Sequence, residues 1–470
     1  MSLISVTLLA IVLLQQPPKL PPQAIVVPSV PAVDRGDARK PAGQSISGTI
    51  LDEQGNPLKG ATVSAWRLSY LAAGERRLWF EGKATSDQTG DYHIDGLKPG
   101  AYYVDAKTSE SVAPTYFPGT ANATSAALVS VSANNGTASV SIRLLSIPLA
   151  KVSGAVLNSQ GIASAEFVVF LSPLRDDGAQ TSSLKLMTEV DDGGKFVIDG
   201  VSPGGYAVAA VSKSRLERIA KTGSGGVGDI VEGAESGVQN ITVDGANVDD
   251  LLIRTTAPVN VAGKITLDGS AITADLAKRL TLYTAERSGP GGVHSVMNRT
   301  FGGVSAEGHF TMPIVSGGRL LRVMGLPDAV TLQRVLVYGI DVTDEGFEVG
   351  NSDIREVVIA LTSKPTHVTG RVTDGQGAPV AAANVIIFPV DSRHWKLVLS
   401  RVLQTVKTSR DGTFDLTGIP SGSYFAAAVS SLADGEWAEP AYLDRLRLAA
   451  TSIKLSDGER KELTLIVKKQ

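Results

Sequence analysis

Hydrophobic and polar residues alternate along most of this chain in runs of about four to eight positions, a period that is typical of β-strands. One such run recurs four times as an apolar residue, a variable residue, a glycine, a second variable residue and a second apolar residue. The intervals between successive glycines are 106, 109 and 107 residues, and the glycines are Gly48, Gly154, Gly263 and Gly370. A repeat of that length corresponds to a whole domain rather than to one unit of a solenoid.

Each copy continues with a polar turn and an aromatic residue, then with a second turn and another large residue ten positions after the first. The paired residues are Tyr92/Tyr102, Phe196/Tyr206, Phe310/Leu320 and Phe414/Tyr424. About seven short strands in about 100 residues are typical of an immunoglobulin-like sandwich. We therefore predict an all-β chain of four tandem immunoglobulin-like or transthyretin-like antiparallel β-sandwich domains in a string.

Two motifs of the repeat resemble those of a known family. The first runs from Gly48 to Val63 and again from Gly370 to Val385, and the second runs from Asp87 to Tyr102 and, closely, from Asp192 to Tyr206. Both resemble the carboxypeptidase regulatory-like domains, here of bacterial type, which are transthyretin-like sandwiches that follow the catalytic domain of some metallocarboxypeptidases. The fourth copy has Ser421 in place of a proline, and the third has lost both the proline and the tyrosine. The resemblance implies the fold and no catalytic activity, because catalysis in that family belongs to another domain.

The repeat and the composition divide the chain into segments. Leu3 to Leu14 is an apolar run too short to span a bilayer, and seven prolines follow it before Ser45. We expect an exported, extracytoplasmic protein, in the periplasm, at the cell surface or secreted. The expected segments are a signal peptide or short anchor (1–14), a Pro-rich disordered linker (15–44) and β-sandwiches at 45–146, 147–256, 257–363 (the most diverged) and 364–470. A proline near each junction (Pro148, Pro258, Pro365) favours a semi-rigid string.

The chemistry-bearing residues narrow the function. A net charge of −3 with interspersed signs does not favour nucleic-acid binding, and the absence of cysteine excludes thiol chemistry and disulfides. The five histidines show no metal-ligand spacing, and we expect neither catalytic residues nor a cofactor nor a metal. The turns at Asp87, Asp192 and Asp411 supply too few oxygens for calcium and are predicted to be turn formers.

Isopeptide chemistry and one helix were also considered. Some similar adhesin-stalk sandwiches form Lys–Asn isopeptide bonds with the help of an acid on the strand after the second turn. We do not expect that reaction, because the corresponding positions are Ala106, Ala210, Val323 and Ala428. Leucines spaced three and five residues apart between Tyr442 and Leu448 predict one helix, which would cap the fourth sandwich.

Aromatic residues supply the candidate binding sites. Trp66 has an aromatic counterpart in every copy, which indicates a scaffold position. Inserts that differ between the copies hold the candidate ligand-binding residues Trp79, Phe80, Trp395 and Trp437. These inserts cover approximately 67–84, 211–236, 285–303, 391–406 and 430–450.

The leading hypothesis is a non-catalytic, monomeric, exported scaffold or binding protein that contacts a protein or surface partner through its variable loops. The first alternative is a carbohydrate-binding protein with a starch-binding-like sandwich and exposed aromatics, which would contact a cell-surface glycan. The second is an accessory subunit of a secreted hydrolase. Beyond the N-terminal signal or anchor we expect no membrane span.

Overall fold

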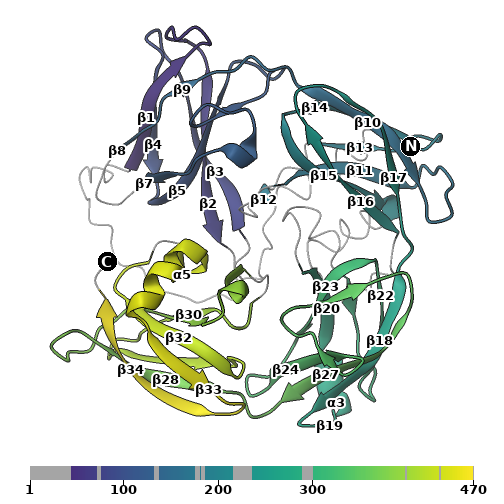
Figure 1. The fold of residues 1–470 in the computed structure, drawn as a ribbon, viewed down its shortest axis with the longest axis vertical. Helices are drawn as coiled ribbons and strands as arrows, with labels where there is room; N and C mark the ends of the chain where they lie inside the picture. The colour runs from purple at the N-terminus through teal and green to yellow at the C-terminus, as the bar shows by residue number, and fades with distance from the viewer. Residues whose placement is uncertain are drawn as a thin grey trace, which may run out of the picture. The chain divides into compact units, whose positions relative to one another are not determined.

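The computed structural model describes residues 44–70, 76–131, 137–174, 180–181, 186–214, 235–287, 300–396, 400–432 and 436–468. The predicted signal peptide and all but the last residue of the predicted linker lie outside these ranges. The chain forms two compact units, and for the described residues the division falls between Leu149 and Ala150, apart from a short segment at 68–79 that is grouped with the second unit. Strands dominate both units (Figure 1), so the all-β sandwich prediction is confirmed.

The first unit contains one sandwich. One sheet is built from β1 (Gln44–Leu51), β4 (Asp91–Leu97), β8 (Thr137–Ser139) and β9 (Ile142–Arg143). The other sheet contains β2 (Thr62–Tyr70), β3 (Arg76–Thr85), β5 (Gly100–Lys107), β6 (Thr115–Tyr116) and β7 (Val129–Val131). A short 3₁₀ helix, η1 (Ala123–Ser125), precedes β7. The core lies between the two sheets, where alternate residues such as Ile46, Ile50, Val63 and Val104 are fully buried.

The second unit contains three further sandwiches. The second sandwich pairs the sheet of β10 (Ala150–Leu157), β14 (Lys195–Val201) and β17 (Val248–Arg254) with the sheet of β11 (Phe167–Pro173), β13 (Met187–Glu189), β15 (Gly204–Ser212) and β16 (Ser236–Val243). Both sheets contribute to a core around Val169, Phe196 and Val208.

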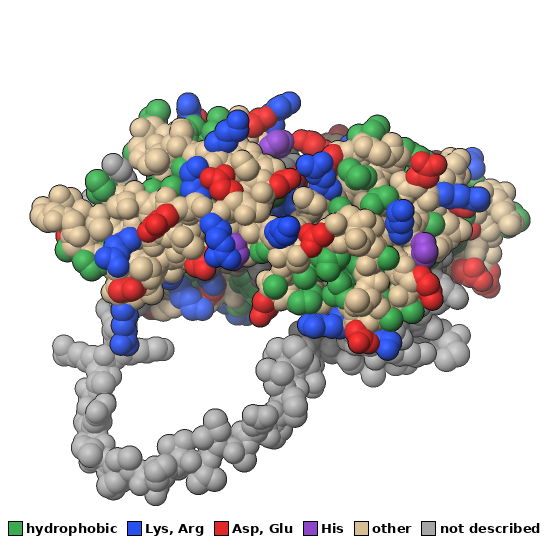
Figure 2. Space-filling model, turned by 90° about the horizontal axis from the view of Figure 1, so that it is seen from below, with side chains coloured by type: hydrophobic (Ala, Val, Ile, Leu, Met, Phe, Trp, Pro, Cys, Tyr) green, Lys and Arg blue, Asp and Glu red, His purple; other side chains and the backbone are tan. Residues whose placement is uncertain are grey.

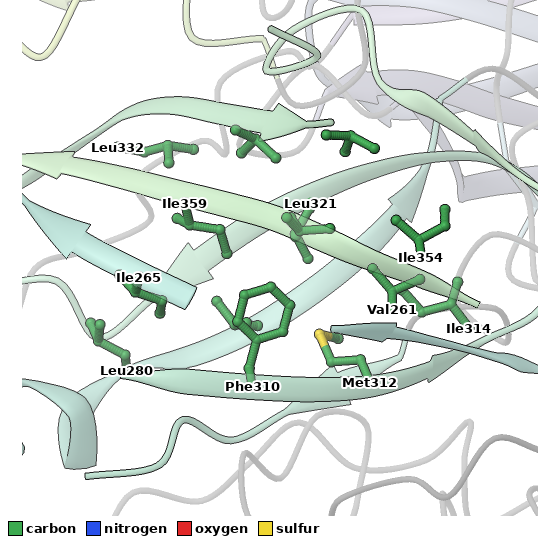
Figure 3. Packing of buried hydrophobic residues seen from close by; sticks show 14 of the residues in the cluster. Val261, Ile265, Leu280, Phe310, Met312, Ile314, Leu321, Leu332, Ile354 and Ile359 are labelled. Carbon is green, nitrogen blue, oxygen red and sulfur yellow. The ribbon is translucent and has the colours of Figure 1, made fainter. Parts of the chain in front are cut away.

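The third sandwich has a six-stranded and a four-stranded sheet. The larger contains β18 (Val259–Leu267), β19 (Ser270–Ala271), β22 (His309–Ile314), β24 (Thr331–Val337), β25 (Ile340–Asp341) and β27 (Ile354–Thr362). The smaller contains β20 (Thr281–Glu286), β21 (Phe301–Gly302), β23 (Gly317–Met324) and β26 (Phe347–Val349). A short helix, α3 (Ala274–Arg279), leads into β20. Figure 3 shows Phe310 and Met312 among the aliphatic side chains of this core.

The strands of the fourth sandwich form a continuous hydrogen-bonded set. They are β28 (His367–Thr373), β29 (Asn384–Pro389), β30 (Gln404–Lys407), β31 (Thr413–Thr417), β32 (Gly422–Val429), β33 (Thr451–Leu455) and β34 (Arg460–Lys468). The last of these strands joins the two layers, because β34 pairs with β28 and, near its end, with β32. The described residues thus enclose one hydrophobic core for each repeat, whereas the exact domain boundaries and the string arrangement stay predictions.

Each opening glycine lies where a second strand comes too close for a side chain. A Cβ atom on these glycines would stand 1.9–2.0 Å from a backbone carbonyl oxygen. The carbonyls belong to Leu251, Val357 and Leu463 of the closing strands and, in the first sandwich, to Val140 between β8 and β9. An aromatic residue sits opposite each glycine on the antiparallel neighbour: Tyr92, Phe196, Phe310 and Phe414. The aromatic ring supplies the packing that the glycine cannot supply.

The close contact between the opening and closing strands also changes the expected strand direction. The opening strand of every sandwich runs parallel to the closing strand, in the pairs β1–β8/β9, β10–β17, β18–β27 and β28–β34. The predicted antiparallel sandwich is therefore mixed at this seam, and in the fourth sandwich β34 also pairs in parallel with β32. Since the first and last strands point the same way, the chain enters each sandwich at one end and leaves it at the other.

The tyrosine of the second turn fixes the strand that follows. The hydroxyls of Tyr102, Tyr206 and Tyr424 each donate a hydrogen bond, 2.7–2.9 Å long, to the backbone carbonyl four residues earlier. In the third sandwich Arg319 takes this role, because its Nε and Nη2 donate to the carbonyl oxygen of Val315. The pairing of Phe310 with Leu320 was therefore wrong by one position, because the segment from Phe310 to the turn glycine Gly317 is one residue shorter than in the other copies.

The predicted helix near residue 442 is confirmed as α5 (Pro440–Leu446), which a 3₁₀ turn, η4 (Arg447–Ala449), extends. Tyr442, Leu443 and Leu446 are buried in a separate cluster with residues of β29 and β32. The helix therefore covers the face of that sheet that points away from the fourth core. Among the described residues no helix is long and apolar enough to cross a membrane.

The close approach at the opening glycine leads to a stability prediction. Gly370→Ala would place a methyl group 2.0 Å from the oxygen of Leu463, a backbone atom that cannot rotate away. We expect a loss of about 3 kcal/mol or more from the fourth sandwich. Gly375→Ala is the matched control, because its Cβ meets nothing within 4 Å. Differential scanning calorimetry of the whole chain measures both, and equal melting profiles for the two variants would contradict the prediction.

Candidate functional site

The four predicted ligand-binding aromatics occupy different environments. Trp79 and Phe80 on β3 have exposed fractions of 41% and 52%. Trp437, in the 3₁₀ helix η3 (Glu436–Ala438), is half-buried and packs against the cluster beneath α5. The structure therefore leaves Trp79 and Phe80 as the accessible pair, and their role in binding stays a prediction.

Trp395 is buried, contrary to its expected place among the exposed aromatics. It lies in the 3₁₀ helix η2 (Ser392–Lys396), and its indole Nε1 donates a 2.8 Å hydrogen bond to the carbonyl oxygen of Pro389. Its ring packs edge-on against Phe388 at a centroid distance of 5.8 Å. Because only 6% of the residue is exposed, almost no surface remains for a ligand to stack on. An insert position in the sequence does not reveal whether its side chain folds back onto the sheet.

The first sandwich contains a buried acid that the sequence analysis did not single out. Asp105 on β5 is 7% exposed, and its carboxylate accepts a hydrogen bond from the indole Nε1 of Trp66. Phe80 packs edge-on against Trp66, with ring centroids 5.4 Å apart. Thus the scaffold role assigned to Trp66 includes a polar contact. The burial of Asp105 could not be inferred from the alternation, which places it on the face opposite Val104 and Ala106.

Burial sets the protonation of this acid. Removal from water raises the pKa of Asp105 to about 6, although the Trp66 hydrogen bond and the charge of Lys107 act in the opposite direction. The positions considered for an isopeptide-forming acid lie instead on the inner side of the strand, where Ala106, Ala210 and Ala428 are buried in the cores and Val323 packs against one. Asp105 therefore does not replace the isopeptide-forming acid, because its side chain lies on the opposite face of the strand.

The polar turns use their side chains to close the turn. Asp87 Oδ1 accepts from the backbone N–H groups of Thr89 and Asp91, and Asp191 Oδ1 accepts from those of Gly193 and Lys195. In the second copy the turn former is thus Asp191 and not Asp192, because only the first turn residue reaches both N–H groups. The equivalent first residues of the third and fourth copies are Ser305 and Ser409. Within the described ranges no group of three or more histidines and acidic residues has the geometry to hold a metal ion.

The insert at 391–406 contacts the third sandwich. Arg401 forms a two-pronged ion pair with Asp344, with Nε–Oδ1 and Nη2–Oδ2 distances of 3.0 and 2.8 Å. A cleft of about 1160 Å³ opens beside this pair between the third and fourth sandwiches of the second unit. Its lining is mostly polar and includes Asp268, Arg334, His367 and Arg460. On the face shown in Figure 2, side chains of both charges are likewise interspersed with hydrophobic ones.

Sequence comparison agrees with the motifs. The family model described as the carboxypeptidase regulatory-like domain matches residues 45–143 and 367–435. The match to this domain family thus covers the first sandwich and most of the fourth, which is less than half of the chain. The two matched segments correspond to the copies whose opening motif fits the family best, and the second and third copies share their glycine seam. A search of curated proteins finds no match to the chain.

Solved structures resemble the chain only distantly. They include the Bacillus anthracis TIE protein (10% identity, TM-score 0.17, covering 93% of this chain and 75% of that one) and BcpA, the major pilin subunit of Bacillus cereus (9%, 0.17, 90% and 98%). GBS52, the minor pilin of Streptococcus agalactiae, is similar over 45% of this chain and 96% of its own (12%, TM-score 0.21). With such low scores, these likenesses carry no inference about function.

In the first sandwich the pKa of Asp105 leads to a pH prediction. The folded-state pKa of about 6 lies above the ordinary value of 3.8, so folding disfavours the carboxylate form. The stabilisation from the bound proton is complete below about pH 4 and is lost as the pH rises through about 6. We expect Asp105→Asn to stabilise this domain at pH 7 by an amount on the order of 2 kcal/mol and to remove that pH dependence.

Hydrogen exchange of β5, measured by mass spectrometry between pH 4.5 and 7.5 and corrected for intrinsic rates, tests this expectation. Asp95→Asn changes an exposed aspartate of the same sandwich and is the control. A pH profile of Asp105→Asn that matches those of the wild type and of Asp95→Asn would contradict the assignment.

Proposed function

We propose that this chain is a non-catalytic, exported scaffold that binds a protein or surface partner through the loops in which its sandwiches differ. The main support is that the positions shared by the four copies all have structural roles. The opening glycine, the aromatic opposite it and the second-turn tyrosine or arginine are all engaged in packing or in backbone hydrogen bonds. Specific recognition is then left to the inserts.

Contacts made by the inserts of the fourth sandwich support a scaffold role. Residues near Arg401 hold the third sandwich, and α5 covers the sheet of the fourth. Because these contacts join and cover sandwiches, they fit a protein whose task is to hold surfaces in place. The match of two segments to the carboxypeptidase regulatory-like domain is consistent with this role.

Glycan binding is the second candidate, and one observation favours it. Trp79 and Phe80 are both exposed, and Phe80 rests on Trp66, which supports its ring from below. Exposed aromatic rings that are held in place by other rings are suited to stacking on sugars.

Binding to isolated cell envelopes tests the proposal. We expect the double variant Trp79→Ala/Phe80→Ala to bind at least roughly tenfold more weakly than the wild type, since aromatic anchors dominate binding energy. Val197→Ala/Leu252→Ala is the control, because it removes similarly exposed apolar side chains from shared strands. Equal binding by all three proteins would contradict a role for this insert.

Protease treatment of the envelopes separates the two candidates. A protein partner predicts that binding is lost after proteolysis, and a glycan partner predicts that it survives and is competed by soluble oligosaccharide. Binding that is competed by sugar and lost in Trp79→Ala/Phe80→Ala would replace the protein-scaffold proposal with the glycan-binding one.

A further inference from the structure

The contact between the third and fourth sandwiches centres on one carboxylate. Asp344 follows β25 in the third sandwich, and Arg401 reaches it from the insert that precedes β30 in the fourth. The third guanidinium nitrogen of Arg401, Nη1, donates a 2.6 Å hydrogen bond to the carbonyl oxygen of Leu332 on β24. All three nitrogens of this one side chain therefore hold the neighbouring sandwich.

The acceptor side of this contact is set in place within the third sandwich. Arg322 on β23 is 5% exposed, and its Nη1 donates a 2.6 Å hydrogen bond to the carbonyl oxygen of Thr343. Its Nη2 stands 3.7 Å from Asp344 Oδ1. Because Arg322 fixes the position of Asp344, Arg401 binds a carboxylate that is already oriented, which lowers the entropic cost of the pair.

The pair is shielded more than an ordinary surface ion pair. The side chains of Arg401 and Asp344 are only 16% and 23% exposed. Exposed charge contacts accompany it: His394 Nε2 is 3.0 Å from Glu345 Oε1, and Arg334 Nη2 is 3.5 Å from Asp457 Oδ2. These outer pairs are open to screening by salt, whereas the Arg401 pair is screened less.

Hydrogen bonds hold the start of the connection between the two sandwiches to the third sandwich. Asp268, at the end of β18, accepts hydrogen bonds from the hydroxyls of Thr362 and Ser363 and from the backbone N–H of Ser363. Pro365 follows two residues later, and the N–H of His367 then donates to the carbonyl of Glu459 in the fourth sandwich. Thr366 is already held by the fourth sandwich, because its carbonyl accepts a hydrogen bond from the N–H of Gly418. The pivot is thus confined to Lys364 and Pro365, and the N–H of Lys364 donates to the hydroxyl of Thr362.

The walls of the cleft carry opposite charges. On the third sandwich the lining holds four aspartates and one arginine: Asp268, Asp328, Asp341, Asp344 and Arg334. On the pivot and the fourth sandwich it holds three strongly basic residues, one aspartate and one histidine: Lys364, Arg401, Arg460, Asp457 and His367. Walls of opposite sign attract each other, and this attraction weakens as the Debye length falls from about 10 Å at 0.1 M salt to about 3 Å at 1 M.

We propose that the third and fourth sandwiches form an electrostatic hinge, which turns about Lys364 and Pro365 and is held closed by a latch, the ion pair of Arg401 with Asp344. At low ionic strength the latch and the opposed walls keep the cleft at the width seen here. At high ionic strength, or without the latch, the fourth sandwich swings away and the cleft opens. The hinge makes the spacing of the loops on the two sandwiches depend on the ionic surroundings.

Two spin labels report the hinge angle. The chain has no cysteine, so Ser352→Cys and Gln376→Cys introduce the only thiols. Both positions are exposed, and each lies at the end of its sandwich away from the pivot, because β27 runs from Ile354 toward the pivot and β28 runs from His367 away from it. Double electron–electron resonance on the full chain then gives the distribution of distances between the labels.

We expect a single narrow distribution at 0.1 M salt that broadens toward longer distances at 1 M. Arg401→Gln should show the broad distribution already at low salt, with the ratio of closed to open molecules reduced roughly tenfold. Arg393→Gln is the matched control: it removes an exposed arginine of the same insert whose partner, Asp391, lies in its own sandwich. Its distribution should equal that of the wild type.

A distribution that is unchanged both in Arg401→Gln and at 1 M salt would overturn the hinge. Should Arg401→Gln fail to fold, Asp344→Asn, which removes the carboxylate that Arg401 binds, provides the second variant. Its distribution should broaden at low salt, and an unchanged distribution together with insensitivity of the wild type to salt would equally refute the proposal.

Discussion

A backbone carbonyl pressed against a glycine is the contact on which every sandwich of this chain depends. The closing strand comes so near the opening strand that a Cβ atom would lie about 2 Å from its carbonyl oxygen. This proximity joins the two ends of each repeat in a parallel pair, so the sheet is completed only when the last strand arrives. The aromatic opposite the glycine fills the space beside it, and in the first sandwich the Tyr92 hydroxyl also donates a hydrogen bond to the Val140 carbonyl that makes the approach.

The outer faces of the sheets differ between the copies although the strands beneath them are equivalent. The outward position on the strand after the second turn is Asp105, Ala209, Arg322 or Ala427 in the four copies, and it is buried in every one. In the first copy an indole covers the acid, in the third the arginine holds the carboxylate that Arg401 binds, and in the fourth α5 covers the alanine. The residues beside this position point inward and stay apolar, because in each copy they pack into the core of their own sandwich. The outer residue differs because what covers it differs.

Several misjudged positions have a common cause, which is that linear spacing does not report backbone path. The segment between Phe310 and Gly317 is one residue shorter than in the other copies, so a count from Phe310 reached Leu320 instead of Arg319. The hydrogen bond from Arg319 to the Val315 carbonyl identifies Arg319 as the equivalent residue. Trp395 was assigned to an exposed insert, yet the chain turns back and buries its ring on Phe388. Arg401 carried no signal at all in the sequence, because its partner lies 57 residues earlier in another sandwich. The helix at Pro440–Leu446 was predictable, since its leucine spacing is local.

The sequence by itself determined the repeat, the all-β class, the sandwich type and the inward-facing residues. These follow from short-range properties: alternation with a period of two, turn-forming residues and a glycine that recurs at a fixed interval. Only the tertiary structure decided the parallel seam, the burial of Asp105 and the Arg401–Asp344 contact. Each of these depends on which surfaces meet across many residues, and charge or hydrophobicity at a single position does not specify its partner.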